Sequence, residues 1–176
     1  MIQLSTILTI YFMMNALLIY DFTKDSDTRN WYIVDDVVMG GRSNGNFYIN
    51  SEGNGVFHGF VSTENYGGFS SVRHRLEKTN VEKFQSFTLK IKGDGKIYQF
   101  RIKSSHTDYY SYIAHFRTTG DWQTVELPFN EMYPSFRGRK LDLPNYRGDT
   151  LEEIAFLIAN KKEEHFKLEI ESINLK

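Results

Sequence analysis

The fold class follows from the stretch Phe87-Thr88-Leu89-Lys90-Ile91-Lys92-Gly93-Asp94-Gly95-Lys96-Ile97-Tyr98-Gln99-Phe100-Arg101-Ile102-Lys103. Apolar side chains occupy every second position from 87 to 91 and again from 98 to 102, with polar side chains between them. A period of two is typical of a β-strand that has one face in the core and the other in water. Because Gly93-Asp94-Gly95 separates the two runs, the stretch predicts a β-hairpin.

Similar strand patterns continue on both sides of this stretch. Further strands are expected at residues 17–22, 31–38, 47–50, 56–62, 68–76, 109–118, 122–127 and 166–173. The continuous apolar run 154–158 predicts a strand buried on both faces, and Thr150 and Glu153 indicate one helical turn before it. No long segment has the 3.6-residue period of a helix. We therefore predict an all-β, single-domain, two-sheet sandwich or jelly roll of about ten strands.

One segment does not read as strand. The three prolines all lie between Phe129 and Gly148, which we expect to be a long surface loop. Loops of this kind often carry function.

Composition removes several classes of function. The chain has 21 Lys and Arg against 22 Asp and Glu, so no net charge draws it to nucleic acid or to an anionic membrane. It has no cysteine, which excludes disulfides, thiolate nucleophiles and cysteine-based metal sites. At 176 residues it is long enough to bury the core of one domain.

The first sixteen residues carry no charged side chain and include an apolar run at residues 7–14. This pattern suggests a signal peptide or other leader over residues 1–16, followed by the domain at 17–176, and it favours an exported or periplasmic location over the cytoplasm. Polar residues interrupt the stretch, so we do not expect an integral membrane protein. The first basic residue is Lys24, which argues against a matrix-targeting peptide.

No familiar catalytic or metal-binding pattern is present. Met39-Gly40-Gly41-Arg42-Ser43 lacks the ending of a phosphate-binding loop, and the five histidines form no ligand pair. Asp35 and Asp36 are adjacent, so in a strand they point to opposite faces and cannot share one substrate as acid and base. We expect no catalysis, metal or cofactor; an enzyme for a small molecule, built on an Arg and Asp cluster, is a third hypothesis.

Binding is a better prospect at two basic clusters and one tyrosine-rich run. The clusters are Arg73-His74-Arg75 and Phe136-Arg137-Gly138-Arg139-Lys140. Arginine can recognise a carboxylate or a phosphate bidentately, although such clusters are more often solvated loop charges. Tyr109, Tyr110 and Tyr112 put a ring on each face of their predicted strand. An exposed ring would stack on a sugar or anchor a protein, and the alternative is cross-strand packing.

Several motifs occur together in a fixed order. They are Trp31 followed by 35–43 (DDVVMGGRS), 67–73 (GGFSSVR), 92–96 (KGDGK), Trp122 followed by 127–129 (LPF), and 136–139 (FRGR). In this order they resemble the complex I intermediate-associated protein 30 family over about residues 19–175.

That resemblance implies a galactose-binding-like β-sandwich with no established catalytic activity. The best-known relatives assist assembly of respiratory complex I in mitochondria by binding intermediates. The resemblance therefore implies the same domain. Because this sequence shows no transit peptide or long N-terminal extension, it leaves open whether complex I is the client.

The glycine pairs 40–41 and 67–68 have two interpretations. They would allow a positive φ or a close backbone approach that presents Arg42 and Arg73 at strand ends. Alternatively, the glycines shape bulges and the arginines pair with Asp35 or Asp36 to close one end of the sandwich.

Our leading hypothesis is a non-enzymatic assembly or chaperone-like factor that binds a protein client, possibly subunits of a respiratory complex or an envelope protein. The alternative is a carbohydrate-binding module of an exported protein. The candidate partner- or ligand-binding residues are Asp35, Asp36, Arg42, Ser43, Arg73, Arg75, Tyr109, Tyr112, Arg137 and Arg139. The residues expected to shape the motif are Gly40, Gly41, Gly67, Gly68, Trp31 and Trp122.

Overall fold

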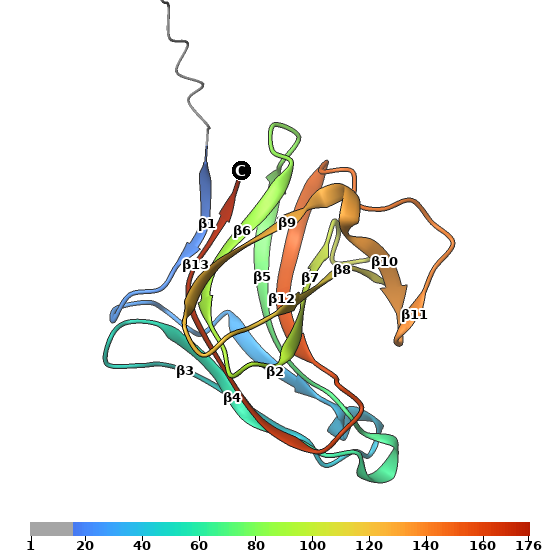
Figure 1. Cartoon of the computed structure of the whole chain (residues 1–176). Helices are drawn as coiled ribbons and strands as arrows, with labels where there is room; N and C mark the ends of the chain where they lie inside the picture. Colours follow the sequence, from blue (N-terminus) through green and yellow to red (C-terminus); the bar gives the residue numbers. More distant parts are fainter. Residues whose placement is uncertain (1–15) are drawn as a thin grey trace, which may run out of the picture.

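The structure, a computed structural model, describes residues 16–176 and consists of two antiparallel sheets that face each other (Figure 1). Within these residues there are thirteen strands, against the ten or so expected. The all-β sandwich is confirmed. The leader expected at residues 1–16 lies outside the described residues except for Ala16.

One sheet has six strands. In spatial order they are β3 (Asn44–Ile49), β4 (Gly55–Val61), β13 (Glu164–Leu175), β6 (Ser86–Lys92) and β9 (Trp122–Pro128), and β1 (Leu17–Asp21) pairs with the end of β13. β13 is therefore central, because β4 and β1 lie along one of its sides and β6 along the other.

The other sheet has seven strands. Their order is β11 (Arg139–Lys140), β10 (Tyr133–Phe136), β8 (Ser111–Arg117), β7 (Ile97–Lys103), β12 (Thr150–Ile158), β5 (Ser70–Asn80) and β2 (Trp31–Asp35). Three short 3-10 turns, η1 (Asp36–Met39), η2 (Glu64–Tyr66) and η3 (Phe129–Glu131), connect strands.

The predicted hairpin at residues 87–103 is wrong. Both strands exist, but β6 belongs to the six-stranded sheet and β7 to the seven-stranded sheet, so the turn between them carries the chain across the sandwich. Asp94 fixes this turn by accepting hydrogen bonds from the Tyr98 hydroxyl (3.0 Å) and from the backbone N–H of Lys167 (2.9 Å). Gly93 is required there, because a Cβ would overlap the Thr118 side chain.

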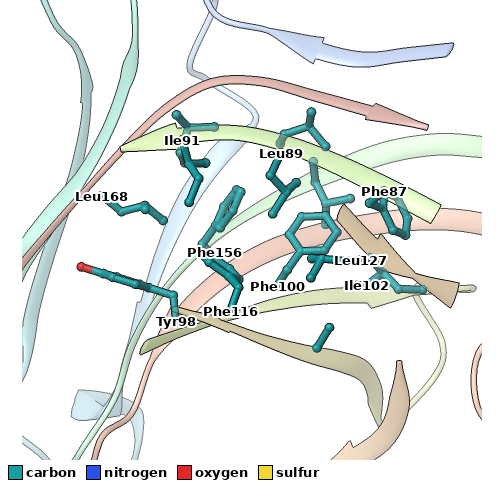
Figure 2. Close-up of a cluster of buried hydrophobic side chains, with 14 of the residues drawn as sticks. Phe87, Leu89, Ile91, Tyr98, Phe100, Ile102, Phe116, Leu127, Phe156 and Leu168 are labelled. Atoms are coloured by element: carbon teal, nitrogen blue, oxygen red, sulfur yellow. The ribbon is translucent and has the colours of Figure 1, made fainter. Parts of the chain in front are cut away.

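The core explains why the two strands face each other instead of pairing. Their apolar side chains point into the space between the sheets, where the Phe87 and Phe100 ring centroids lie 5.0 Å apart (Figure 2). Phe100 also lies 5.3 Å from the ring of Phe156 on β12. Alternation identifies the buried face of each strand, but two buried faces can meet across a core as well as side by side in a sheet.

Several expected boundaries also change. The strand at 154–158 is confirmed, but β12 begins at Thr150, so the helical turn predicted there is wrong. The segment 129–148 is not one loop, since it contains η3, β10 and β11. β8 starts at Ser111, which leaves Tyr109 outside it. In the part of the chain that the structure describes, no helix is long and apolar enough to cross a membrane.

Candidate functional site

Asp36 organises the loops at one end of the sandwich. It follows β2 directly and its side chain is fully buried. Its carboxylate accepts hydrogen bonds from the backbone N–H groups of Ser43 (2.9 Å), Gly68 (2.6 Å) and Phe69 (3.2 Å), and from the Ser43 hydroxyl (2.5 Å). One carboxylate therefore ties the loop that follows β2 to the loop that precedes β5.

The same bonds determine the charge of this group. Burial raises the pKa of the Asp36 carboxyl, but the hydrogen bonds from Ser43, Gly68 and Phe69 outweigh burial and hold that pKa below its ordinary value. Asp36 is thus an anion whose charge is stabilised by hydrogen bonds from uncharged amide and hydroxyl donors. Its oxygens are occupied by the protein itself, which gives it a structural role.

The arginines do not pair with the aspartates as one interpretation supposed. Arg42 forms an ion pair with Glu64 on the surface (Nη1 to Oε2, 2.8 Å). Asp35 accepts hydrogen bonds from the backbone N–H of Gly45 (2.8 Å) and from the Ser70 hydroxyl (2.6 Å). Both aspartates therefore hold loops and strands together.

The glycine pairs fit around Asp36. Gly40 has a φ of 91° and Gly68 a φ of 137°, which side chains other than glycine rarely adopt. Gly41 and Gly67 lie against the carboxylate, where a Cβ on either residue would overlap the Asp36 side chain. In each pair, one glycine provides the backbone angle and the other provides the space.

This difference gives a matched pair of substitutions. Gly40→Ala has open space around its new methyl group and should cost about 1 to 2 kcal/mol, the penalty of a left-handed backbone. Gly41→Ala must displace the buried carboxylate, so we expect it to exceed Gly40→Ala by roughly 1 to 3 kcal/mol. Urea unfolding of both variants would measure the difference, and equal costs would contradict the packing described here.

The loops tied by Asp36 expose large apolar side chains. Val37, Val38 and Met39 of η1 are 60%, 76% and 57% exposed, and Tyr66 of η2 is 99% exposed with a φ of 61°. We call these four residues the apolar tip. The hydrogen bonds to Asp36 and the ion pair between Arg42 and Glu64 hold the two loops side by side at the lower end of Figure 1.

Arg73 and Arg75 lie elsewhere, on the face of the seven-stranded sheet turned away from the core, which we call the outer face. Arg73 is in the middle of β5 and not at a strand end. Directly paired residues of neighbouring strands share a face. The registers therefore align one row of six residues across the sheet, here called the arginine row: Tyr32, Arg73, Ala155, Arg101, Ile113 and Tyr133.

Polar contacts link this row to its neighbours. Glu153 is buried and receives a hydrogen bond from the Tyr32 hydroxyl (3.0 Å) and an ion pair from Arg73 (3.5 Å). Arg101 donates from Nε (2.9 Å) and Nη2 (2.6 Å) to the side-chain oxygen of Gln99. Burial, with a further contribution from the charge of Arg73, lowers the pKa of Arg101 to about 10. Arg101 is still a cation at neutral pH.

The last group of candidates surrounds the β10–β11 hairpin. Arg137 and Arg139 are exposed there, and the Arg137 guanidinium lies 5.3 Å from the Phe136 ring. Tyr109 is 62% exposed and its ring meets Phe136 edge-on at 5.3 Å. Tyr112 instead packs at the edge of the core, 5.2 Å from the Tyr146 ring.

The two tryptophans also differ. Trp31 is buried and stacks on His74 at 4.7 Å, while Trp122 begins β9 and is half-buried. The candidate binding residues are thus divided among the Asp36 loops, the outer face and the β10–β11 hairpin, except for Tyr112 at the edge of the core.

Sequence reasoning missed Tyr32, Gln99, Arg101 and Glu153. The alternation from 97 to 103 does put Gln99 and Arg101 on the wet face of their strand. It could not pair them with Arg73, because β5, β7 and β12 are far apart in sequence. A shallow depression of about 330 Å³ at the β2 edge is lined by Arg29, Asn30, Tyr32 and Arg75.

The chain is similar in fold to solved carbohydrate-binding modules. A Family 11 module from Clostridium thermocellum in complex with a beta-1,3-1,4-mixed-linked tetrasaccharide has a TM-score of 0.68 at 18% identity, covering 91% of this chain and 94% of that one. The Family 11 module of the C. thermocellum cellulase Lic26A-Cel5E also has a TM-score of 0.68, at 17% identity, and covers 92% and 94% of the two chains. At these identities the likeness shows the jelly-roll sandwich fold.

Sequence comparison gives the family. The mitochondrial Complex I intermediate-associated protein 30 of Drosophila melanogaster is 23% identical over 185 residues, which cover 89% of this chain. The match spans only 62% of that relative's length. The family model for Complex I intermediate-associated protein 30 (CIA30) matches residues 20–170, and the chain belongs to this family.

Proposed function

We propose that this protein is a non-catalytic binding domain that holds a partner protein through its apolar tip, in the manner of an assembly factor. The main observation is that three consecutive large apolar residues, Val37, Val38 and Met39, are exposed on the turn η1, which the hydrogen bonds to Asp36 hold in place. Contiguous exposed apolar surface on a folded protein commonly marks a contact with another protein.

The construction of the tip supports this proposal. Because the carboxylate bonds fix the backbone of both loops, the tip would lose little conformational freedom on binding. The ion pair of Arg42 with Glu64 lies beside it and would provide a polar rim around an apolar centre. Family membership supports an assembly role, and an intermediate of a respiratory complex is the first partner to test.

The test compares two triple variants. Val37→Ser/Val38→Ser/Met39→Ser removes the apolar tip, while Leu18→Ser/Tyr48→Ser/Leu143→Ser removes exposed apolar side chains elsewhere and serves as the matched control. Each protein is cross-linked in lysate of its native host, and captured proteins are quantified by mass spectrometry. We expect captured partners to fall roughly tenfold or more in the tip variant alone, as for loss of a binding hot spot. Equal capture by both variants would reject the tip.

A second candidate function is carbohydrate binding on the outer face. Two observations favour it: the arginine row has a tyrosine at each end, and hydrogen-bonding side chains lie between them. Aromatic rings and planar polar groups on a rigid surface suit the stacking and hydroxyl bonding of sugars. Binding of any glycan on an array, lost on changing the row and kept on changing the tip, would support it.

A further inference from the structure

We infer that the outer face binds a sugar carrying a carboxylate, and that Arg73 and Arg101 hold this carboxylate above Ala155. The inference rests on the second candidate function and adds the chemical class of the ligand. It starts from the register, which puts Ala155 of the central strand β12 directly between Arg101 of β7 and Arg73 of β5. Neighbouring strands lie about 4.8 Å apart, so the two arginine Cα atoms are roughly 10 Å apart.

The residue between the two arginines, Ala155, has a small side chain. Ala155 is buried and covers little of the sheet, while the long side chains beside it are only partly exposed. The Arg73 guanidinium pairs with Glu153 and the Arg101 guanidinium with Gln99, so each is fixed beside Ala155 by a neighbour on the same face. A planar carboxylate between them would accept hydrogen bonds from the terminal Nη groups of both guanidinium groups, because Arg101 already uses its Nε on Gln99 and the Nε of Arg73 is buried.

The charges of this site are not balanced within the protein. Among residues 16–176, Arg101 makes no ion pair, and the buried Nε of Arg73 has no hydrogen-bond partner. Arg73 shares the single carboxylate of Glu153 with the hydroxyl of Tyr32. Lys103 and Arg75 flank Glu153 in the register and add two more cations. An anionic ligand would supply the missing negative charge.

The surrounding groups favour a sugar over an acidic peptide or a phosphate. Glu153 and the oxygen of Gln99 are acceptors beside the arginine donors. Sugar hydroxyls donate and accept, so one uronic acid residue would use both kinds of group, whereas the carboxylate of an acidic side chain would use the arginine donors only. The six strands of the row span about 24 Å, which leaves room for several sugar units.

Calorimetric titration of the full chain tests this with four probes: tetragalacturonate, its methyl ester, hexaglutamate and inorganic phosphate. We expect tetragalacturonate to bind at least tenfold more tightly than the ester, and Arg101→Ala to weaken it about tenfold or more, because the charged hydrogen bonds of the guanidinium group are lost. Arg101→Lys keeps the positive charge but loses the planar guanidinium group, so its affinity for tetragalacturonate should lie between those of the native protein and Arg101→Ala. Arg147→Ala, an exposed arginine lining a different depression, is the matched control and should bind normally.

The outcomes separate the inference from the function on which it rests. If the ester or other neutral glycans bind as well as the acid, the carboxylate site is overturned while carbohydrate binding stands. If no glycan of either kind binds, both fail. Hexaglutamate or phosphate binding as tightly as tetragalacturonate would overturn the sugar assignment. Circular dichroism of Arg101→Ala and Arg101→Lys establishes that both are folded, and unchanged affinity in both folded variants would overturn the role of Arg101.

Discussion

Asp36→Ala is expected to lower the free energy of unfolding by about 3 to 5 kcal/mol. The effect is large even though Asp36 begins a short surface turn and all the donors to its carboxylate are uncharged. The reason is the number of donors it satisfies. Removing the carboxylate leaves the backbone N–H groups of Ser43, Gly68 and Phe69 without an acceptor, and the Ser43 hydroxyl keeps only the longer bond to the Ser62 carbonyl (3.4 Å). Each buried donor without a partner costs roughly 1 to 3 kcal/mol unless water replaces the lost bond.

Two further variants make the result specific. Asp36→Asn keeps the shape and one acceptor oxygen but turns an amide donor toward other donors, so its cost should be smaller than that of Asp36→Ala and still clear. Asp121→Ala changes an exposed aspartate and should cost about 0.5 kcal/mol or less. All three are measured by urea unfolding at neutral pH. A cost for Asp36→Ala close to that of Asp121→Ala would mean that the carboxylate does not hold the loops.

The pH dependence gives an independent check. Since the pKa of Asp36 is lowered in the folded protein, its contribution is fully present above the ordinary value of 3.8 and is lost as the pH falls through the lower folded value. The stability difference between the native protein and Asp36→Asn should therefore stay constant from neutral pH down to about pH 5 and shrink below pH 4. A difference that grows on acidification would have the wrong sign.

The apolar tip should respond to the same substitution through its backbone. In Asp36→Asn, if the fold persists, the loops lose part of their anchoring while Val37, Val38 and Met39 stay in the chain. Partner binding would then carry an additional ordering cost. The DDVVMGGRS motif thus contains both the Asp36 anchor and three of the four exposed residues of the apolar tip.

The sequence predicted the layers of the fold well because period two reports which face of each strand is buried. It did not predict which strands pair, since pairing depends on contacts between distant segments. The run 154–158 was identified as a central strand because it is apolar throughout. The strands of 129–148 were missed because β10 is short and contains Pro134, and strand propensity counts against proline.

The candidate site was predictable in part for the same reason. The glycine pairs and Asp36 belong to motifs that the sequence shows, but the sequence does not show that the carboxylate accepts a hydrogen bond from Gly68 of the second pair, thirty-two residues away. Two of the four tip residues, Val37 and Val38, fall within the predicted strand 31–38, because both have high strand propensity. The arginine row combines residues from six strands, so only the register brings Arg73 and Arg101 to one face.

Phe100→Ala is the second substitution with a large expected effect, about 3 to 5 kcal/mol of destabilisation, because it removes a fully buried ring from the centre of the core. The ring contacts Phe87 of the opposite sheet and Phe156 of its own sheet (Figure 2). Urea unfolding would measure the loss, and the slope of the transition would report whether the variant still unfolds from a compact state.

The placement of β6 and β7 in different sheets can be tested more directly by a pair of substitutions than by Phe100→Ala alone. In a hairpin, Phe87 and Phe100 would lie in the same sheet and would not be directly paired. In the sandwich, their ring centroids lie 5.0 Å apart across the core. Phe87→Ala and Phe100→Ala should therefore be non-additive, with a coupling of roughly 0.5 to 3 kcal/mol in a double-mutant cycle. Phe100→Ala combined with Tyr48→Ala, which truncates an exposed ring on β3, should be additive within about 0.5 kcal/mol. Additivity in both cycles would refute the crossing of the chain between the sheets.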